Sequence, residues 1–101
     1  MAELARANGI KVVLCSILPV YDYPWRPGLQ PAPKIMAINA WLKDYAAAHG
    51  DVYADYHTAM QDARHGLPDS LAHDGVHPTE AGYQIMAGIV QRAIDEALAK
   101  P

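Results

Sequence analysis

Several features that would assign a sequence quickly to a class of protein are scarce here. Cys15 is the only cysteine, so the chain can form no internal disulfide. No apolar run approaches the roughly 20 residues that a membrane-spanning helix needs, and the segment Met1 to Gly9 lacks the apolar stretch of a signal peptide. Basic blocks are also missing, and the formal net charge of −3 argues against nucleic acid or an anionic membrane as a partner.

What remains is the composition of a single globular domain. The chain has 101 residues, of which 51% are hydrophobic and 19% are charged, and this length suffices for one small domain. Glycine, proline and polar residues divide it into segments whose periodicity predicts helices and strands in alternation. We expect a helix over Ala2 to Ala7, a strand over Ile10 to Leu18, a loop over Val20 to Pro33, a helix over Lys34 to His49, a strand over Asp51 to Tyr56, a loop over His57 to Pro78 and a helix that begins after Thr79.

The order of these segments predicts an α/β fold with parallel strands and helical crossovers. The first strand, I-K-V-V-L-C-S-I-L, is almost continuously apolar, which favours a strand buried on both faces. Trp41 and Tyr45, four residues apart in the middle helix, are expected to pack at or near the core. Two strands alone do not make a stable parallel sheet, so we expect further strands from outside this sequence. The alternative is a complete small domain.

One short segment concentrates the residues that can do chemistry. Asp74 and His77 stand three residues apart in D-G-V-H-P, just before the last predicted helix. Gly75 permits a tight turn between them, so the carboxylate can curl back to one nitrogen of the imidazole. A carboxylate in that position fixes the tautomer of the ring and steadies the imidazolium that forms when the other nitrogen accepts a proton. Pro78 allows a helix to begin directly after His77.

The segment D-G-V-H-P-T-E-A-G-Y, from Asp74 to Tyr83, resembles the last signature block of SGNH (GDSL-type) serine esterases. The strand ending in S-I-L-P, the helix containing A-I-N-A-W-L and the strand D-V-Y-A-D-Y follow in the order of that family, so the resemblance covers essentially the whole chain. It implies a flavodoxin-like three-layer α/β/α fold. It also implies that Asp74 and His77 are the acid and the base of a Ser-His-Asp triad that hydrolyses a small carboxylic ester, with neither a metal nor an organic cofactor.

The other functional blocks of that family have no counterpart in this sequence. The family's nucleophilic serine lies in a G-D-S block near the N-terminus, and its oxyanion-hole glycine and asparagine come from two intermediate blocks. The only serines here, Ser16 and Ser70, and the only asparagines, Asn8 and Asn39, lie outside such motifs. We therefore expect residues 1–101 to be the C-terminal portion of one SGNH domain, inactive by itself. Its partner would be the missing N-terminal half or a second copy of the chain.

Other interpretations of the same residues stay open. Asp74 and His77 could form a purely structural turn, and the chain could be a non-catalytic α/β module that associates with itself. His73 and His77 have the four-residue spacing of a zinc-binding helix. Pro78, however, keeps His77 out of a helix interior, so the two rings would not share one helical face and metal binding is disfavoured.

The loop after the first predicted strand carries further candidates. Tyr21, Tyr23, Trp25 and Arg26 lie beyond the carboxyl end of that strand, which is where α/β folds bind ligands. These side chains, Tyr21 and Trp25 in particular, could therefore wall the pocket for the acyl or the alcohol part of a substrate. The alternative is that this loop, rich in proline and aromatic residues, packs down only for stability.

Overall fold

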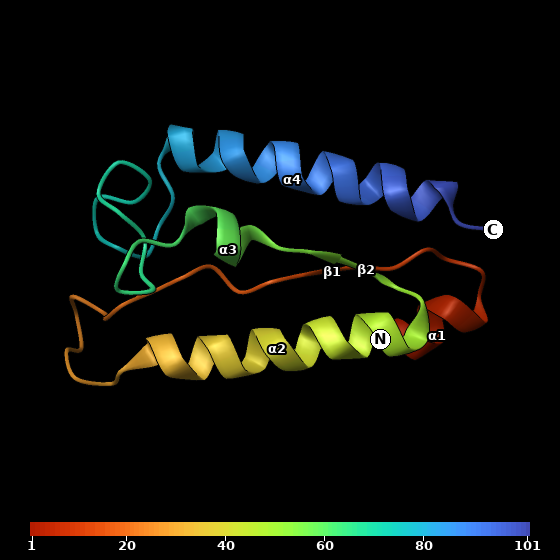
Figure 1. Cartoon of the computed structure of the whole chain (residues 1–101), viewed down its shortest axis with the longest axis horizontal. Helices are drawn as coiled ribbons and strands as arrows, with labels where there is room; N and C mark the ends of the chain where they lie inside the picture. Colours follow the sequence, from red (N-terminus) through yellow and green to blue (C-terminus); the bar gives the residue numbers. More distant parts are fainter.

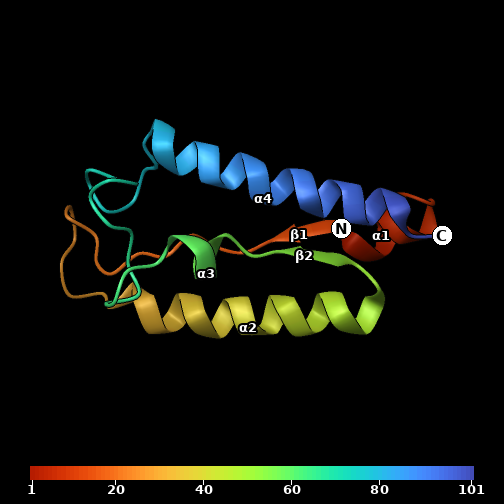
Figure 2. The same cartoon turned by 45° about the horizontal axis from the view of Figure 1, so that its top comes forward.

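Two short parallel strands lie between helices in the computed structural model, which describes all of residues 1–101. The elements, in chain order, are α1 (Ala2–Ala7), β1 (Val13–Cys15), α2 (Pro31–His49), β2 (Val52–Ala54), α3 (Tyr56–Met60) and α4 (Glu80–Ala99). Figure 1 shows three layers, with α4 on one side of the strands and α2 on the other, and the turned view in Figure 2 shows the same order. The predicted α/β class with parallel strands is confirmed.

The two strands have one neighbour each. The carbonyl of Val12 accepts a hydrogen bond from β2 at 3.1 Å, and the amide of Ser16 donates one to β2 at 2.9 Å. Alternate residues of a strand face the same neighbour in a parallel ladder, so Leu14 also faces β2. The backbone groups of Val13 and Cys15 face the other way, along an edge of β1 that no strand of this chain covers.

The hydrophobic core lies between β2, α3 and α4. Val52 and Ala54 of β2, Met60 of α3 and the two alanines Ala93 and Ala97 of α4 are each at most 5% exposed. Because alanine is small, the backbone of α4 can lie close to the strand while the interior stays densely packed. The core also includes Tyr56, Leu67 and Ala72, and it is flanked by the partly buried Val13, Leu18, Leu71, Met86, Ile89 and Val90.

The helices differ from the prediction mainly at their starts. α2 begins at Pro31, before the predicted Lys34, because proline is favoured in the first turn of a helix, where its missing N–H has no partner. α3 lies inside the segment predicted as a loop. Its cap is the carboxylate of Asp55, which accepts the amide of Thr58 at 3.0 Å. α4 begins after Thr79, as predicted.

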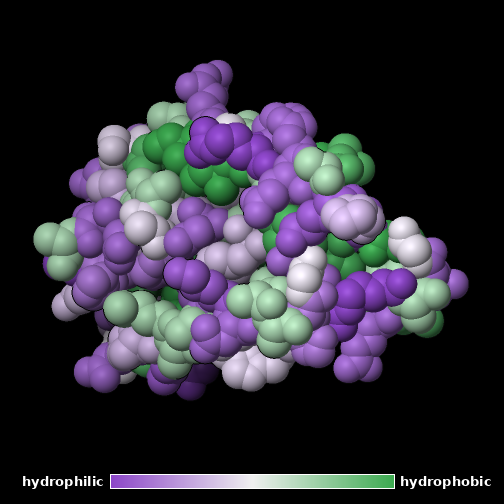
Figure 3. All heavy atoms as spheres, turned by 45° about the vertical axis from the view of Figure 1, so that its right-hand side comes forward, coloured by the Kyte–Doolittle hydropathy of each residue, from purple (hydrophilic) through white to green (hydrophobic).

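The strands are shorter than predicted, and β1 is not buried on both faces. Val13 and Leu14 are only partly buried, and Cys15 is exposed, because nothing lies along the open edge of β1. The prediction for Trp41 is also wrong, since its side chain is 61% exposed. Figure 3 shows hydrophobic patches open between hydrophilic atoms on the face that brings the chain ends forward. None of the helices combines the length and the hydrophobicity required to cross a bilayer.

Candidate active site

Asp74 and His77 are joined in a tight turn between α3 and α4. One carboxylate oxygen of Asp74, Oδ2, lies 2.6 Å from Nδ1 of the His77 ring. The other oxygen, Oδ1, accepts the backbone amides of Val76 and His77 at 2.8 and 2.7 Å. Gly75 has a φ of +78°, a left-handed conformation that other residues rarely adopt and that lets the chain reverse here. The turn predicted from D-G-V-H is therefore present.

Hydrogen bonds stabilise the ionised form of the Asp74 carboxyl. The bond to the His77 ring, followed by those from the amides of His77 and Val76, holds the pKa of the Asp74 carboxyl well below its ordinary value. Asp74 is consequently ionised throughout the neutral pH range and accepts the hydrogen bond from the ring. The bond to Nδ1 leaves Nε2 of His77 free for another group. The side chains of His77 and Asp74 are 74% and 40% exposed, so the pair is open at the surface.

The start of α4 fixes the turn in place. The hydroxyl of Thr79 accepts the amide of Gly82 at 3.3 Å and donates to the carbonyl of Ser70 at 3.0 Å. The amide of Thr79 donates to the carbonyl of Leu71 at 2.7 Å. A Cβ atom on Gly82 would lie only 2.8 Å from that same carbonyl oxygen. The segment before His77 is thus held against the first turn of the helix that follows it.

The loop between β1 and α2 meets this turn at one end of the molecule. Figure 1 shows both segments beyond the carboxyl ends of the strands. The ring centroids of Trp25 and His77 are 6.1 Å apart with a 38° tilt, and Tyr23 lies 5.4 Å from Trp25. Tyr21 is elsewhere, with its ring beneath the guanidinium of Arg64. The structure therefore brings Trp25, but not Tyr21, to the Asp74–His77 pair.

An apolar groove ends beside the pair. It has a volume of about 550 Å³ and lies between the segment after β1 and the first half of α2. Val76, the neighbour of His77, and Tyr23, the neighbour of Trp25 in the aromatic cluster, line its end. Its other lining residues are Ile17, Leu18, Val20, Leu29, Pro31, Lys34, Ile35 and Ile38.

The serines and the helical asparagine of the chain have structural partners. The Oγ of the buried Ser16 accepts the amides of Tyr56 and His57 at 3.0 and 3.1 Å, so this hydroxyl fixes the start of α3. The side chain of Asn39 pairs with both backbone groups of Ile17, at 2.8 and 3.0 Å. Ser70 contributes its carbonyl to Thr79. None of these residues is brought next to His77 as a nucleophile or an oxyanion donor.

His73, the histidine of the zinc interpretation, is exposed and makes no hydrogen bond. No three side chains of His, Cys, Asp or Glu lie together in a way that could hold a metal ion. Sequence reasoning missed Arg64 and Gly66, which contact Tyr21 at the base of the aromatic loop. Only the spacing of Asp62 and Gly66 signals a turn there, and nothing in the sequence shows what that turn touches.

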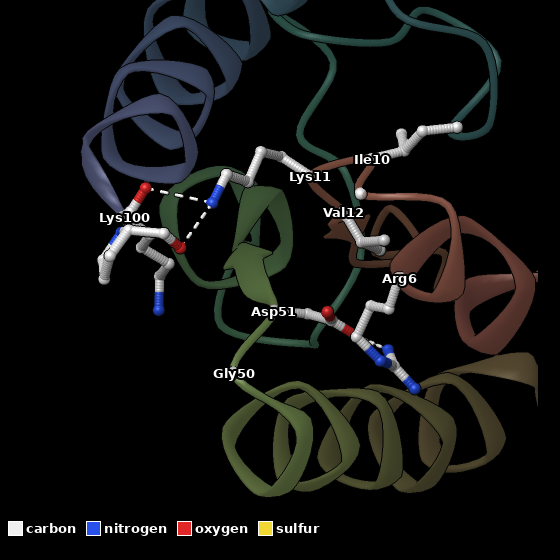
Figure 4. A pocket seen from close by; sticks show the side chains of 9 residues that line it. Arg6, Ile10, Lys11, Val12, Gly50, Asp51 and Lys100 are labelled. Carbon is white, nitrogen blue, oxygen red and sulfur yellow. Dashed lines mark hydrogen bonds and ion pairs between the residues drawn. The ribbon is translucent and has the colours of Figure 1, made fainter.

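The opposite end of the molecule carries a polar pocket of about 480 Å³. Figure 4 shows Arg6 of α1 pointing to Asp51, with the two side chains joined at 2.5 Å, and Lys11 reaching across to the end of the chain. The Lys11 ammonium donates to the carbonyl oxygens of Lys100 and Pro101 at 3.0 and 2.7 Å. These contacts tie α1 to the residue before β2, and the segment before β1 to the end of α4, at the end of the strands that lies away from the Asp74–His77 pair.

The Asp74–His77 pair thus lies beyond the carboxyl ends of parallel strands, which is where open α/β sheets bind their ligands. The chain belongs to the GDSL-like lipase/acylhydrolase family, whose sequence model matches residues 1–85. Among curated proteins, none matches this chain.

Solved structures show the same fold. A protein named as an acylhydrolase from Bacteroides fragilis is 40% identical with a TM-score of 0.88; the match covers 96% of this chain and 48% of that protein. A GDSL-like lipase from Bacteroides thetaiotaomicron is 42% identical with a TM-score of 0.87, over 95% of this chain and 48% of the lipase. The esterase domain of the ORF1 protein from the zebrafish ZfL2-1 retrotransposon is 20% identical with a TM-score of 0.75, over 94% and 53% of the two chains, and shares the fold. The chain thus spans about half the length of these relatives.

Proposed function

We propose that residues 1–101 are the C-terminal portion of one SGNH-type domain and supply the Asp–His part of a Ser-His-Asp triad in a carboxylic ester hydrolase. The observation that carries the proposal is the 2.6 Å hydrogen bond between Asp74 Oδ2 and His77 Nδ1, with Nε2 left free on an exposed ring. Membership of the acylhydrolase family supports the type of reaction.

The pair acts through the proton on Nδ1. Asp74 accepts that proton in a hydrogen bond, so neutral His77 carries its lone pair on Nε2. Nε2 takes the proton of a serine hydroxyl as the serine oxygen attacks the ester carbonyl, and Asp74 stabilises the imidazolium that results. His77 then gives this proton to the leaving alkoxide and later deprotonates the water that hydrolyses the acyl-serine. Trp25 lies beside the ring.

The serine and the oxyanion donors come, in this proposal, from the N-terminal half of the same domain. Two observations support it. The relatives are about twice as long as the matched region, and the open edge of β1 is suited to accept a further strand. Ser16, the serine nearest that edge, is buried and already bonded to two amides, so it is not available to act as the nucleophile.

The experiment is a chimera in which the unmatched part of the B. thetaiotaomicron lipase precedes Met1. We expect it to hydrolyse p-nitrophenyl acetate, and His77→Ala to remove nearly all turnover. Asp74→Asn should lower turnover by about 10⁴-fold, because the orienting carboxylate is lost. His73→Ala and Asp69→Asn, exposed residues of the same segment, are the matched controls and should leave activity unchanged. A folded His77→Ala chimera with full activity would refute the proposal.

The 101-residue chain alone should hydrolyse this ester no faster than buffer does. Removal of the nucleophile and the oxyanion donors together leaves only weak acceleration from binding. Robust hydrolysis that disappears in Ser16→Ala or Ser70→Ala would contradict the assignment of the serine to the other half.

A second candidate function is self-association without catalysis, and the open edge of β1 favours it too. An unpaired strand edge is a template for another chain, and the exposed Leu4 and Ile10 line an apolar groove together with Val12, Val13 and Leu14. Sedimentation equilibrium at micromolar concentration distinguishes a self-associating chain from a folded monomer. We expect the isolated chain to form dimers or larger assemblies, whereas a folded species of 11.0 kDa that melts cooperatively would show that the chain is complete without a partner.

A further inference from the structure

The loop that carries Trp25 is closed by its own hydrogen bonds. We call residues 21–28 the aromatic arm. The Asp22 carboxylate accepts the amides of Tyr23 at 2.9 Å and Gly28 at 3.2 Å, and so ties the two ends of the arm together. The amide of Arg26 donates to the carbonyl of Tyr23 at 3.1 Å. With these bonds in place, a displacement at the base of the arm carries Trp25 along with it.

The base of the arm rests on a second turn, residues 62–66. A Cβ atom on Gly66 would lie 2.6 Å from Cβ and 2.9 Å from the backbone nitrogen of Tyr21, far inside ordinary contact distance. Only glycine therefore allows the two backbones to approach this closely. The guanidinium carbon of Arg64 lies 4.4 Å from the centroid of the Tyr21 ring, a cation–π contact from the same turn.

The turn that holds the arm is built independently of the Asp74–His77 turn. The Asp62 carboxylate accepts the amides of Arg64 and Gly66 at 2.9 and 3.1 Å, and the amide of Asp62 donates to the carbonyl of Gly66 at 2.8 Å. The bond from Gly66, the largest contribution, lowers the pKa of the Asp62 carboxyl. The turn thus stays closed and charged around neutral pH without help from the residues near His77.

We infer that Gly66 and Arg64 are positioning residues that hold Trp25 against the imidazole of His77. The arm spans from the 62–66 turn, where Tyr21 is clamped, to its tip, where Trp25 lies on one side of the His77 ring at 6.1 Å between centroids. With that side occupied, the ester and its leaving alcohol approach Nε2 from the other side of the ring. This last consequence for the substrate rests on the proposed function, whereas the clamp itself does not.

Nuclear magnetic resonance of the 101-residue chain tests the clamp directly. We expect nuclear Overhauser contacts between the ring protons of Trp25 and His77. Gly66→Ala should abolish them, although Trp25 and His77 are both still present, because the added methyl group displaces Tyr21. The matched control is Gly88→Ala, where an added Cβ meets no other atom within 4 Å, and there the contacts should remain. The amide shifts of β1 and β2 should stay close to wild type in every variant.

A second pair of variants keeps the test decisive if Gly66→Ala does not fold. Arg64→Met removes only the cation and should weaken the Trp25–His77 contacts, and Arg64→Lys, which retains a cation over the ring, should restore them. Contacts that persist unchanged in both Gly66→Ala and Arg64→Met would overturn the inference, and so would their absence in the wild-type chain. Neither result bears on esterase activity, so the failure of the clamp and the failure of the proposed function are distinguishable.

Discussion

The two strands of this protein have opposite surroundings. β2 is covered by α4 and α2 and contributes Val52 and Ala54, which are 3% and 1% exposed, to the core. Each strand leaves one edge unpaired, but β1 is less buried: Val13 and Leu14 are only partly buried, Cys15 is exposed and Ile17 is 39% exposed. The burial of apolar side chains around β2 therefore stabilises this chain, while β1 leaves backbone groups and apolar surface available to a further strand or a second copy. The following predictions test that difference.

The largest effect should come from proline placed at the two edges of β1. Leu14→Pro removes an amide that faces β2 and should destabilise the chain by about 3 kcal/mol or more, enough to prevent folding. Val13→Pro removes an amide that faces the open edge; it should weaken pairing with a second copy but leave a cooperative thermal transition of the chain. Circular dichroism melting measures both. Equal damage from the two substitutions would mean that the outer edge is already in use.

Truncation of two methionines compares the core with the exposed surface. Met60 is 1% exposed and Met36 is 40% exposed. Met60→Ala should lower the free energy of unfolding by about 2–5 kcal/mol, because it leaves a cavity between α3 and α4. Met36→Ala should change it by about 0.5 kcal/mol or less. Urea denaturation of both variants checks the difference, and a cost for Met36→Ala as large as that for Met60→Ala would contradict it.

A smaller effect is expected at the helix start beside the Asp74–His77 turn. Thr79→Ala removes the cap of α4 and the bond to the Ser70 carbonyl, and should cost about 1 kcal/mol of stability. Thr79→Ser keeps the hydroxyl and should recover most of this loss. If Thr79→Ser were as unstable as Thr79→Ala in the same denaturation experiment, the methyl group rather than the cap would be responsible.

The smallest effect concerns pH. Burial lowers the pKa of His57, whose Nε2 has no hydrogen-bond partner; Asp55 opposes this shift and His65 adds to it. In the unfolded chain this histidine binds a proton near pH 6.5. The contribution of neutral His57 to the free energy of unfolding is therefore present above that pH and is lost as the pH falls towards the lower pKa of the folded state. His57→Leu should flatten this decline in urea titrations between pH 7 and 5, and His73→Leu, at an exposed site, should not.

The sequence predicted the features that depend on near neighbours. The Asp74–His77 turn and the Thr79 cap join residues at most nine positions apart, so their chemistry can be read from the order of residues. The lengths of the strands could not be read in this way, because a strand extends only as far as its neighbour continues. The prediction that Trp41 packs at or near the core failed for a related reason. Helical spacing shows which residues share a face of a helix, not whether anything covers that face.

The contact between Trp25 and His77 was beyond sequence reasoning for another reason. Trp25 was predicted as a pocket wall from its place after a strand, and its approach to the ring depends on Tyr21 and Gly66, 45 positions apart. Tyr21 was predicted to share that role, but its ring lies under Arg64. Contacts between segments so far apart follow from the packing of the whole chain, and no local pattern encodes them.

The Lys11 bridge to the carbonyl oxygens of Lys100 and Pro101 holds the residues after α4 beside the segment before β1, at one end of a molecule 43 Å long. His77 and Trp25 lie at the opposite end of the molecule. A label or a solid support attached at Pro101 would therefore leave the imidazole facing solution. Attachment at this end would orient the molecule in an assay on a solid support, with His77 exposed. A Lys11→Met variant would make the attached end more mobile and would not alter the surroundings of His77.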